Sequence, residues 1–185
     1  MTNLNHKPWE ILSSKDVYVA EPWIRVEKQQ VRLPNGKIID DYHRIQLQDW
    51  TLIFALTPDG QIVVENQYKH ALGKMALVLP AGGIEDGETP EFAAQRELLE
   101  ETGYKADNWQ CLGSFLSHGN YGLGRAHVFR AENAQLVAEP SSGDLETTEI
   151  QIMTLEEFAA AIKDGRVELW GSMAAFALAT NPLLS

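Results

Sequence analysis

The chain has 185 residues and a formal net charge of -11, which suffices for one domain with a substantial core, or one domain with a small appendage. Its acidity argues against a nucleic-acid-binding protein, because polyanion binding uses Lys and Arg to neutralise phosphates. No apolar run approaches the roughly 18 residues that span a bilayer, and the N-terminus lacks a secretory-signal pattern. We therefore expect a cytoplasmic protein without nucleic-acid or membrane partners.

Cys111 is the single cysteine in the sequence. A lone cysteine excludes an intramolecular disulfide and any zinc site built from several cysteines. We expect it to be a small core residue.

The first 47 residues look like an extension of a main domain at residues 48–185. Residues 17–47 are strand-like on both sides of a reversal signal at Leu33–Gly36. This pattern predicts an N-terminal β-hairpin.

Further strands are predicted on either side of a turn at Pro58–Gly60. The first of them is almost entirely apolar, so both of its faces should be buried. The three segments are residues 51–56, 61–68 and 75–79.

A glycine-rich loop at residues 79–88 leads into a predicted helix at Pro90–Thr102. Thr89 suits the N-cap, and proline is favoured at the first helical position. Gly103 is a natural C-terminal stop.

The rest of the chain mixes strands with two more helices. Thr154 and Glu157 form a capping-box pattern before a helix that Gly165 would end, and residues 172–179 predict another helix. Strands are predicted at residues 109–115, 125–131 and 149–153. Without an internal repeat, this mixture predicts an α/β (α+β) domain.

The helix at residues 90–102 places three like charges in one sector. At about 100° per residue, Glu97, Glu100 and Glu101 share one side of it, where they repel one another. Phe92, Gln95 and Leu99 fall on the other side, so the helix could pack by one face and present carboxylates from another. Such a cluster suits a metal site.

The residues around this helix resemble the Nudix box. The matched residues are Gly82, Glu88, Arg96, Glu97, Leu98, Glu100, Glu101 and Gly103. Tyr104 departs from the box, where an aliphatic residue is usual. The resemblance to the Nudix hydrolase family implies a Nudix-like α/β/α sandwich with a mixed sheet, in which the box forms a loop and a helix.

The resemblance also implies hydrolysis of a nucleoside diphosphate linked to another group, with Mg²⁺ or, as a substitute, Mn²⁺. Hard cations are needed because a diphosphate repels an attacking water. By resemblance, Glu97, Glu101 and the carbonyl of Ala81 are metal ligands. Glu100 would join them directly or through water.

Three other box residues are expected to support these ligands. Arg96 would orient the glutamates through charge-assisted hydrogen bonds, and Glu88 would tie loop to helix in the same way. Gly82 would let the backbone approach metal and phosphate.

The general base is left open among three glutamates. In the ADP-ribose pyrophosphatase group the base typically lies on a loop well after the box, where this chain has Glu146 and Glu149. Glu100, inside the box, is the alternative.

The order of elements also resembles the ADP-ribose pyrophosphatase group, which implies ADP-ribose or a nucleotide sugar as the substrate. In that group the N-terminal strands help to form a homodimer, and their aromatic residues can stack on adenine. Trp23 and Tyr42 are the corresponding candidates here, although aromatic residues in a hairpin also serve in packing.

Three residues depart from that group's usual pattern. Lys69 stands where a phosphate-binding arginine is usual. A lysine there can supply positive charge, but it cannot form the two parallel hydrogen bonds that an arginine makes to a phosphate. Val78 replaces a glutamate, and His118 replaces a proline in a glycine-rich loop where it could contact substrate.

Two alternatives remain open. The same chemistry could act on a nucleoside triphosphate or a dinucleoside polyphosphate. The chain could also be a Nudix module that senses a nucleotide without cleaving it, although the intact glutamate set argues against a pure binder.

Overall fold

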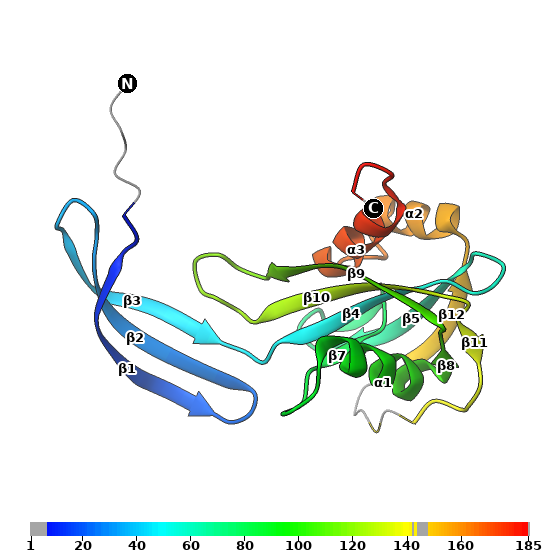
Figure 1. Cartoon of the computed structure of the whole chain (residues 1–185), viewed down its shortest axis with the longest axis horizontal. Coiled ribbons are helices and arrows are strands. Elements are labelled where there is room, and N and C mark those ends of the chain that lie inside the picture. Colours follow the sequence, from blue (N-terminus) through cyan, green and yellow to red (C-terminus); the bar gives the residue numbers. More distant parts are fainter. Residues whose placement is uncertain (1–6, 142, 144–147, 185) are drawn as a thin grey trace. The chain divides into compact units, whose positions relative to one another are not determined.

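The computed structural model describes residues 7–141, 143 and 148–184. Two compact units can be distinguished along the chain (Figure 1). The N-terminal unit consists of residues 1–48 and 116–125, and the main unit consists of residues 49–115 and 126–185.

The N-terminal unit contains a three-stranded antiparallel sheet in the order β1-β2-β3. Its strands are β1 (Glu10–Ala20), β2 (Ile24–Arg32) and β3 (Ile38–Gln46). The predicted hairpin is confirmed for β2 and β3, whose turn is closed by a 2.9 Å hydrogen bond from the Gly36 N–H to the Leu33 carbonyl. A third strand, β1, pairs with the other edge of β2 and begins at Glu10, ahead of the predicted strand-like region.

The main unit carries two larger sheets and a short strand pair. One sheet has the order β7-β4-β10-β9, with β4 and β10 parallel, and the other has the antiparallel order β12-β5-β6. The strands are β4 (Trp50–Ala55), β5 (Ile62–Lys69), β6 (Lys74–Val78), β7 (Ala81–Gly83), β8 (Tyr104–Lys105), β9 (Asn108–Leu116), β10 (Arg125–Glu132), β11 (Gln135–Leu136) and β12 (Thr148–Met153).

Helices cover both sides of these sheets. α1 (Pro90–Thr102) contributes Leu98 to a core with Ile53 of β4. α2 (Leu155–Lys163) and α3 (Trp170–Thr180) pack in a second core that includes Leu52, the next residue along β4. Because neighbouring strand residues point to opposite faces, β4 lies between α1 on one side and α2 with α3 on the other. This arrangement is the predicted α/β/α sandwich.

Several local predictions are confirmed. Residues 51–55 of β4 are all buried. The capping box of α2 has both of its hydrogen bonds, one from the Glu157 N–H to the Thr154 side chain and one from the Thr154 N–H to the Glu157 carboxylate.

Two predictions were wrong. Cys111 is exposed and not part of the core, because the strand β9 that carries it has one side facing solvent. Residues 81–83, predicted as part of a loop, form the short strand β7, which pairs with the start of β4. Its sequence of alanine and two glycines gives no strand signal, so only the pairing partner produces it.

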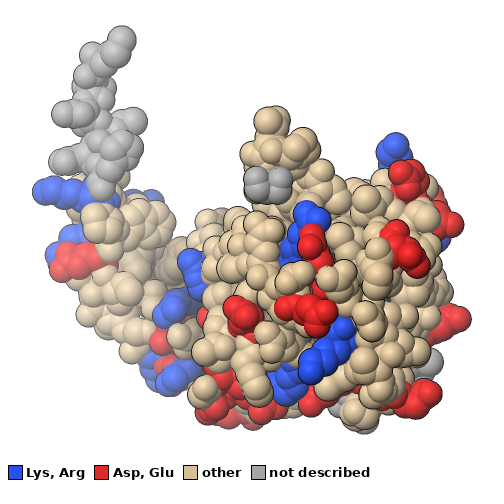
Figure 2. Space-filling model, turned by 45° about the vertical axis from the view of Figure 1, so that its right-hand side comes forward, with Lys and Arg blue, Asp and Glu red and all other residues tan. Residues whose placement is uncertain are grey.

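None of the helices in the described ranges is long and apolar enough to cross a membrane. On the face shown in Figure 2, Lys and Arg side chains are scattered among Asp and Glu and do not form one basic patch. The charge distribution on this face agrees with the acidic balance of the sequence.

Candidate active site

The helix α1 begins and ends where the sequence predicts. The Thr89 hydroxyl accepts a 3.2 Å hydrogen bond from the Phe92 N–H, and Gly103 closes the helix in the left-handed conformation with φ of 75°. These caps fix the length of the helix that carries the candidate glutamates.

The packing face of α1 differs from the expected one. Ala94 and Leu98 are fully buried, whereas Phe92 and Leu99 are 58% and 37% exposed. The small side chain of Ala94 allows close approach to the sheet, so the helix packs through this narrower face and leaves the larger apolar side chains outside. Glu101 lies at the edge of the packing face and is only 8% exposed.

Arg96 connects the glutamates of the box with the loop before the helix. Its guanidinium donates to Glu88 at 2.8 and 2.9 Å, to Glu97 at 2.8 Å, to Glu100 at 3.1 Å and to the Gly83 carbonyl at 2.9 Å. One side chain therefore holds three carboxylates and a backbone oxygen in a fixed relation, as the fork of five N–H donors allows.

The ion pair with Arg96 changes the titration of Glu88. Hydrogen bonds from Arg96, opposed by burial and reinforced by the Glu85 N–H, hold the pKa of the Glu88 carboxyl below its ordinary value. In turn, hydrogen bonds to Glu88 raise the pKa of Arg96. Both groups are charged at neutral pH, so the loop is tied to α1 as predicted.

Glu101 meets the strand β7 from the other side of the site. Its carboxylate accepts a 2.9 Å hydrogen bond from the Ala81 N–H. This contact holds the predicted backbone ligand at Ala81 next to a predicted carboxylate ligand.

Gly82 allows the closest approach between β7 and α1. A Cβ atom at this position would lie 2.0 Å from the Cδ of Glu97. A Cβ there would overlap the carboxylate, so any other residue at this position would force the Glu97 side chain to move.

The donor set suits a hard divalent cation, since carboxylate and backbone carbonyl oxygens are the ligands of Mg²⁺. Among the described residues, however, no three His, Cys, Asp or Glu side chains converge into a ready-made metal cage. Arg96 draws Glu97 and Glu100 toward itself, and the Ala81 N–H engages Glu101. Binding of a cation would therefore need these side chains to turn toward it, while the helix and β7 already bring them together.

Of the predicted bases that the structure describes, Glu100 lies on α1 and Glu149 lies on β12. Glu149 is an exposed residue of β12 that pairs with Asn66 of β5, and its carboxylate accepts a 3.5 Å hydrogen bond from Gln151. Glu146 lies outside the described residues. Glu100 is therefore the only one of the three candidates that the structure describes in contact with Arg96.

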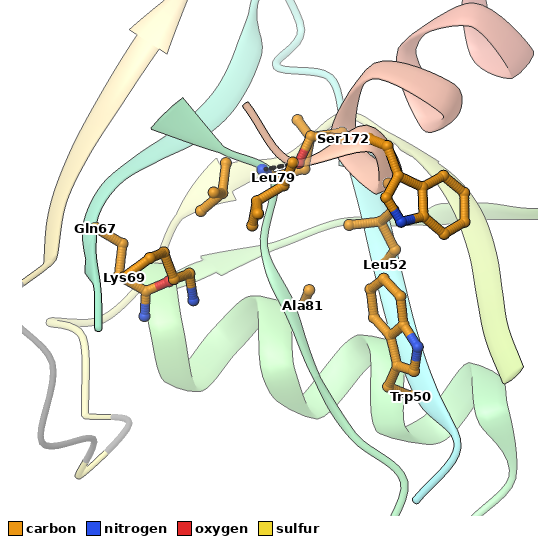
Figure 3. Close-up of a pocket in the computed structure, with 11 residues that line it drawn as sticks. Trp50, Leu52, Gln67, Lys69, Leu79, Ala81 and Ser172 are labelled. Carbon is orange, nitrogen blue, oxygen red and sulfur yellow. Dashed lines mark hydrogen bonds between the residues drawn. The ribbon is translucent and has the colours of Figure 1, made fainter. Parts of the chain in front are cut away.

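A cavity of about 250 Å³ opens beside Ala81 (Figure 3). Lys69, the predicted phosphate contact, lines it together with Val78. The other lining residues are Trp50, Leu52, Gln67, Leu79, Ala81, Leu169, Trp170, Gly171 and Ser172.

Sequence reasoning missed Trp50, Gln67 and Trp170 as possible contacts of a ligand. Gln67 and Lys69 are two residues apart in a strand and therefore share a face, which was a usable signal. No sequence signal predicts that Trp170 lines the cavity, because its position depends on where α3 begins.

The remaining predicted substrate contacts belong to the N-terminal unit. Trp23 is 76% exposed. The Tyr42 ring packs edge-on against Trp9, and its hydroxyl donates to the Asn120 carbonyl. The His118 ring lies 4.8 Å from that of Tyr121.

The comparison with known families decides the identity of this arrangement. Residues 47–176 match the NUDIX domain. The chain belongs to the Nudix family. Residues 9–45 of this Nudix protein separately match the nucleoside diphosphate sugar hydrolase N-terminal domain.

Relatives of similar length support the same assignment. An ADP-ribose pyrophosphatase of Bacillus subtilis (strain 168) is 32% identical over 172 residues, which cover 91% of this chain and 86% of that protein. A GDP-mannose pyrophosphatase of Pectobacterium atrosepticum is 32% identical over 173 residues, covering 87% and 88% of the two chains.

A crystal structure of an ADP compounds hydrolase matches with a TM-score of 0.81 and 19% identity, over 94% of this chain and 92% of that chain. This likeness confirms the Nudix-like fold. The family and the relatives matched over most of their length make the protein a Nudix pyrophosphohydrolase, an enzyme that hydrolyses a nucleoside diphosphate linked to another moiety.

Proposed function

We propose that this Nudix hydrolase cleaves ADP-ribose or a related nucleoside diphosphate sugar into a nucleoside monophosphate and a sugar phosphate, with Mg²⁺ as its cofactor and Mn²⁺ as a substitute. The names of two full-length relatives, an ADP-ribose pyrophosphatase and a GDP-mannose pyrophosphatase, support this substrate class. The match of residues 9–45 to the nucleoside diphosphate sugar hydrolase N-terminal domain supports it independently.

The observation that carries the proposal is the contact between α1 and β7. Glu101 accepts a hydrogen bond from the N–H of Ala81, and Glu97 lies against Gly82, so two box carboxylates contact the backbone of β7. Glu97, Glu100, Glu101 and the Ala81 carbonyl would hold the divalent ion. When bound, the ion neutralises the diphosphate oxygens and orients an attacking water.

The other residues of the site position these groups. Arg96 holds Glu97 and Glu100 by hydrogen bonds, and Glu88 anchors Arg96 to the loop. Lys69 in the neighbouring cavity supplies positive charge for a phosphate. The water's proton passes to Glu100, Glu146 or Glu149, and replacing each by glutamine in turn identifies the base by the largest loss of kcat.

We also propose that the enzyme is a homodimer formed through the sheet of its N-terminal unit. Large apolar side chains are exposed along β1 and in the turn after it. Exposure of such a group of side chains to water is unfavourable, and it is typical of a surface that binds another protein chain. The exposed residues are Ile11, Val17, Tyr18, Val19 and Trp23.

A substrate panel tests the proposed reaction. ADP-ribose, GDP-mannose, nucleoside triphosphates and dinucleoside polyphosphates are incubated with Mg²⁺ or Mn²⁺, and the products are identified by mass spectrometry. We expect AMP and ribose 5-phosphate from ADP-ribose. Preferred cleavage of a triphosphate or dinucleoside polyphosphate would overturn the substrate class, and binding without any hydrolysis would favour a sensing module.

A further inference from the structure

Two residues, Leu79 and Pro80, connect β6 to β7. The Leu79 N–H donates to the hydroxyl of Ser172 in α3 at 3.1 Å (Figure 3). The Pro80 carbonyl accepts a 2.9 Å hydrogen bond from a backbone N–H of β4. The next N–H, that of Ala81, donates to Glu101 of α1 at 2.9 Å. Three consecutive residues are therefore each held by a different element, and α3 holds the first of them.

Leu79 lies outside the paired residues of both neighbouring sheets. β6 pairs with β5 as far as Val78, and β7 pairs with β4 from Ala81 onward. Leu79 lies between these two ladders and is 1% exposed. A buried N–H without a partner is strongly unfavourable, so the Ser172 hydroxyl stabilises the backbone at this point.

Ser172 is the polar member of an otherwise apolar packing face. The buried residues of α3 are Ser172, Ala175 and Ala179. Ser172 is 3% exposed, and a buried hydroxyl is costly unless it forms a hydrogen bond. Its contact with the Leu79 N–H provides that hydrogen bond and gives a physical reason for a serine at this position.

Gly171, the residue before Ser172, lies close to β4. A Cβ at Gly171 would lie 3.3 Å from the Trp50 ring and 3.5 Å from the Leu52 side chain. The first turn of α3 therefore packs directly on β4, the strand that also pairs with β7. This packing fixes the place of Ser172 relative to the chain that leads into β7.

From these contacts we infer that Ser172 is a positioning residue of the metal site, which holds the Leu79 backbone and through it the Ala81 carbonyl. This inference rests on the proposed function, in which that carbonyl is a metal ligand. The proline between Leu79 and Ala81 has a fixed φ, so a displacement of Leu79 is passed on to Ala81. The Glu101 carboxylate would follow, because it accepts the hydrogen bond from the Ala81 N–H.

A purely structural role for Ser172 gives a different expectation. In that case the hydroxyl only satisfies a buried N–H, and its removal lowers the melting temperature without changing the metal site. Thr154 provides the comparison, because its hydroxyl also accepts a backbone N–H at 3.1 Å. It lies at the start of α2, outside the segment that leads into β7. Metal affinity therefore separates positioning from stabilisation.

Titration of the full-length protein with Mn²⁺ in the absence of substrate tests the inference without turnover. Electron paramagnetic resonance measures the free Mn²⁺ and thereby gives the dissociation constant. We expect Ser172→Ala to raise this constant about 10-fold, as is typical when a group that orients a metal ligand is removed. Thr154→Ala should leave the constant unchanged, although both variants should lower the melting temperature.

Ser172→Thr tests whether the hydroxyl itself is responsible. It keeps the acceptor, and the cavity that Ser172 lines has room for the added methyl group, so its Mn²⁺ affinity should match that of the wild type. Circular dichroism checks that each variant is folded. If Ser172→Ala is not, Ser172→Cys carries the test, because sulfur is a weaker acceptor than a hydroxyl and should weaken Mn²⁺ binding in the same direction.

The inference is overturned if the wild-type protein does not bind Mn²⁺ or if Ser172→Ala binds it with wild-type affinity. It is also overturned if Thr154→Ala weakens Mn²⁺ binding as much as Ser172→Ala does, or if Ser172→Thr fails to restore it. Failure of the proposed function looks different. In that case the substrate panel shows no hydrolysis of nucleoside diphosphate sugars, while the dependence of Mn²⁺ affinity on Ser172 persists.

Discussion

At the scale of single residues, the site depends on side chains that are fixed by opposite charge. Arg96 uses its whole guanidinium on Glu88, Glu97, Glu100 and the Gly83 carbonyl. The mutual repulsion expected of glutamates on one helix sector is thereby offset within the chain itself. A bound cation would replace some of the hydrogen bonds between Arg96 and these glutamates by metal–oxygen bonds.

The predicted metal ligands can be tested by removing charge and keeping shape. Glu97→Gln or Glu101→Gln should lower kcat with Mg²⁺ about 100-fold or more, because each removes an anionic ligand. The folded state should persist, since the amide oxygen of glutamine can still accept the Ala81 N–H that Glu101 binds. Steady-state kinetics and thermal unfolding measure the two effects. Near-normal activity in either variant would remove that residue from the ligand set.

The close contact at Gly82 gives another prediction at this scale. Gly82→Ala would place a methyl group 2.0 Å from the Cδ of Glu97 and should displace that carboxylate, lowering kcat more than it lowers the melting temperature. Gly119→Ala is the matched control, because a Cβ there meets nothing within 4 Å. An unchanged kcat in Gly82→Ala would contradict this prediction, because it would show that catalysis does not depend on the position of the Glu97 carboxylate.

At the scale of elements, the connection between the loop and α1 decides whether the box acts as one unit. Glu88 accepts hydrogen bonds from Arg96 and from the Glu85 N–H. Among the described residues, Glu88 is the one side chain of this loop that forms a hydrogen bond with Arg96. Loss of this tie should loosen the entry to α1 without touching the sheets.

This tie predicts a pH-dependent stability. The pKa of Glu88 is lower in the folded chain than its ordinary value of 4.5, so its contribution is present above that value and is lost as pH falls through the lower folded pKa. Glu88→Gln should therefore reduce the free energy of unfolding by about 1 to 3 kcal/mol at pH 7. Urea unfolding should find a smaller difference between variant and wild type below pH 4.5. An equal difference at both pH values would contradict the assignment.

The elements themselves were predictable where local chemistry determines them. Thr89, Pro90 and Gly103 set the ends of α1, and the capping box set the start of α2. Strand β7 could not be predicted, because Ala81–Gly83 becomes a strand only by pairing with β4. The packing face of α1 was misjudged for a related reason, since the sheet's shape selects Ala94 and Leu98 over the larger Phe92.

At the scale of the whole molecule, the main unit holds the Nudix helix and the cavity, and the N-terminal unit holds a sheet with exposed apolar residues. The loop at residues 116–125 belongs to the N-terminal unit although it follows a strand of the main unit. The Ile45 N–H donates to the Tyr121 carbonyl at 2.8 Å, which ties this loop to β3.

The proposed homodimer is the prediction at this scale. Analytical ultracentrifugation should give the mass of two chains. Val19→Lys in the edge strand β1 should shift the protein toward the monomer, because it places a charge among the exposed apolar residues. Lys37→Gln, in the turn between β2 and β3, should leave the assembly unchanged. A monomeric wild-type protein at micromolar concentration would contradict the proposal.

The sequence by itself determined the family and the reaction class and proposed the charged residues of the site, because the Nudix box is a local pattern of residue types at fixed spacing along one loop and one helix. The tertiary structure alone decided how those charges are paired and what lies next to them. Arg96 reaches a loop eight or more residues away, Glu101 bonds a strand twenty residues before it, and Trp50, Gln67 and α3 meet around one cavity. Such contacts follow from the packing of the sheets and helices, which no local pattern of residues contains.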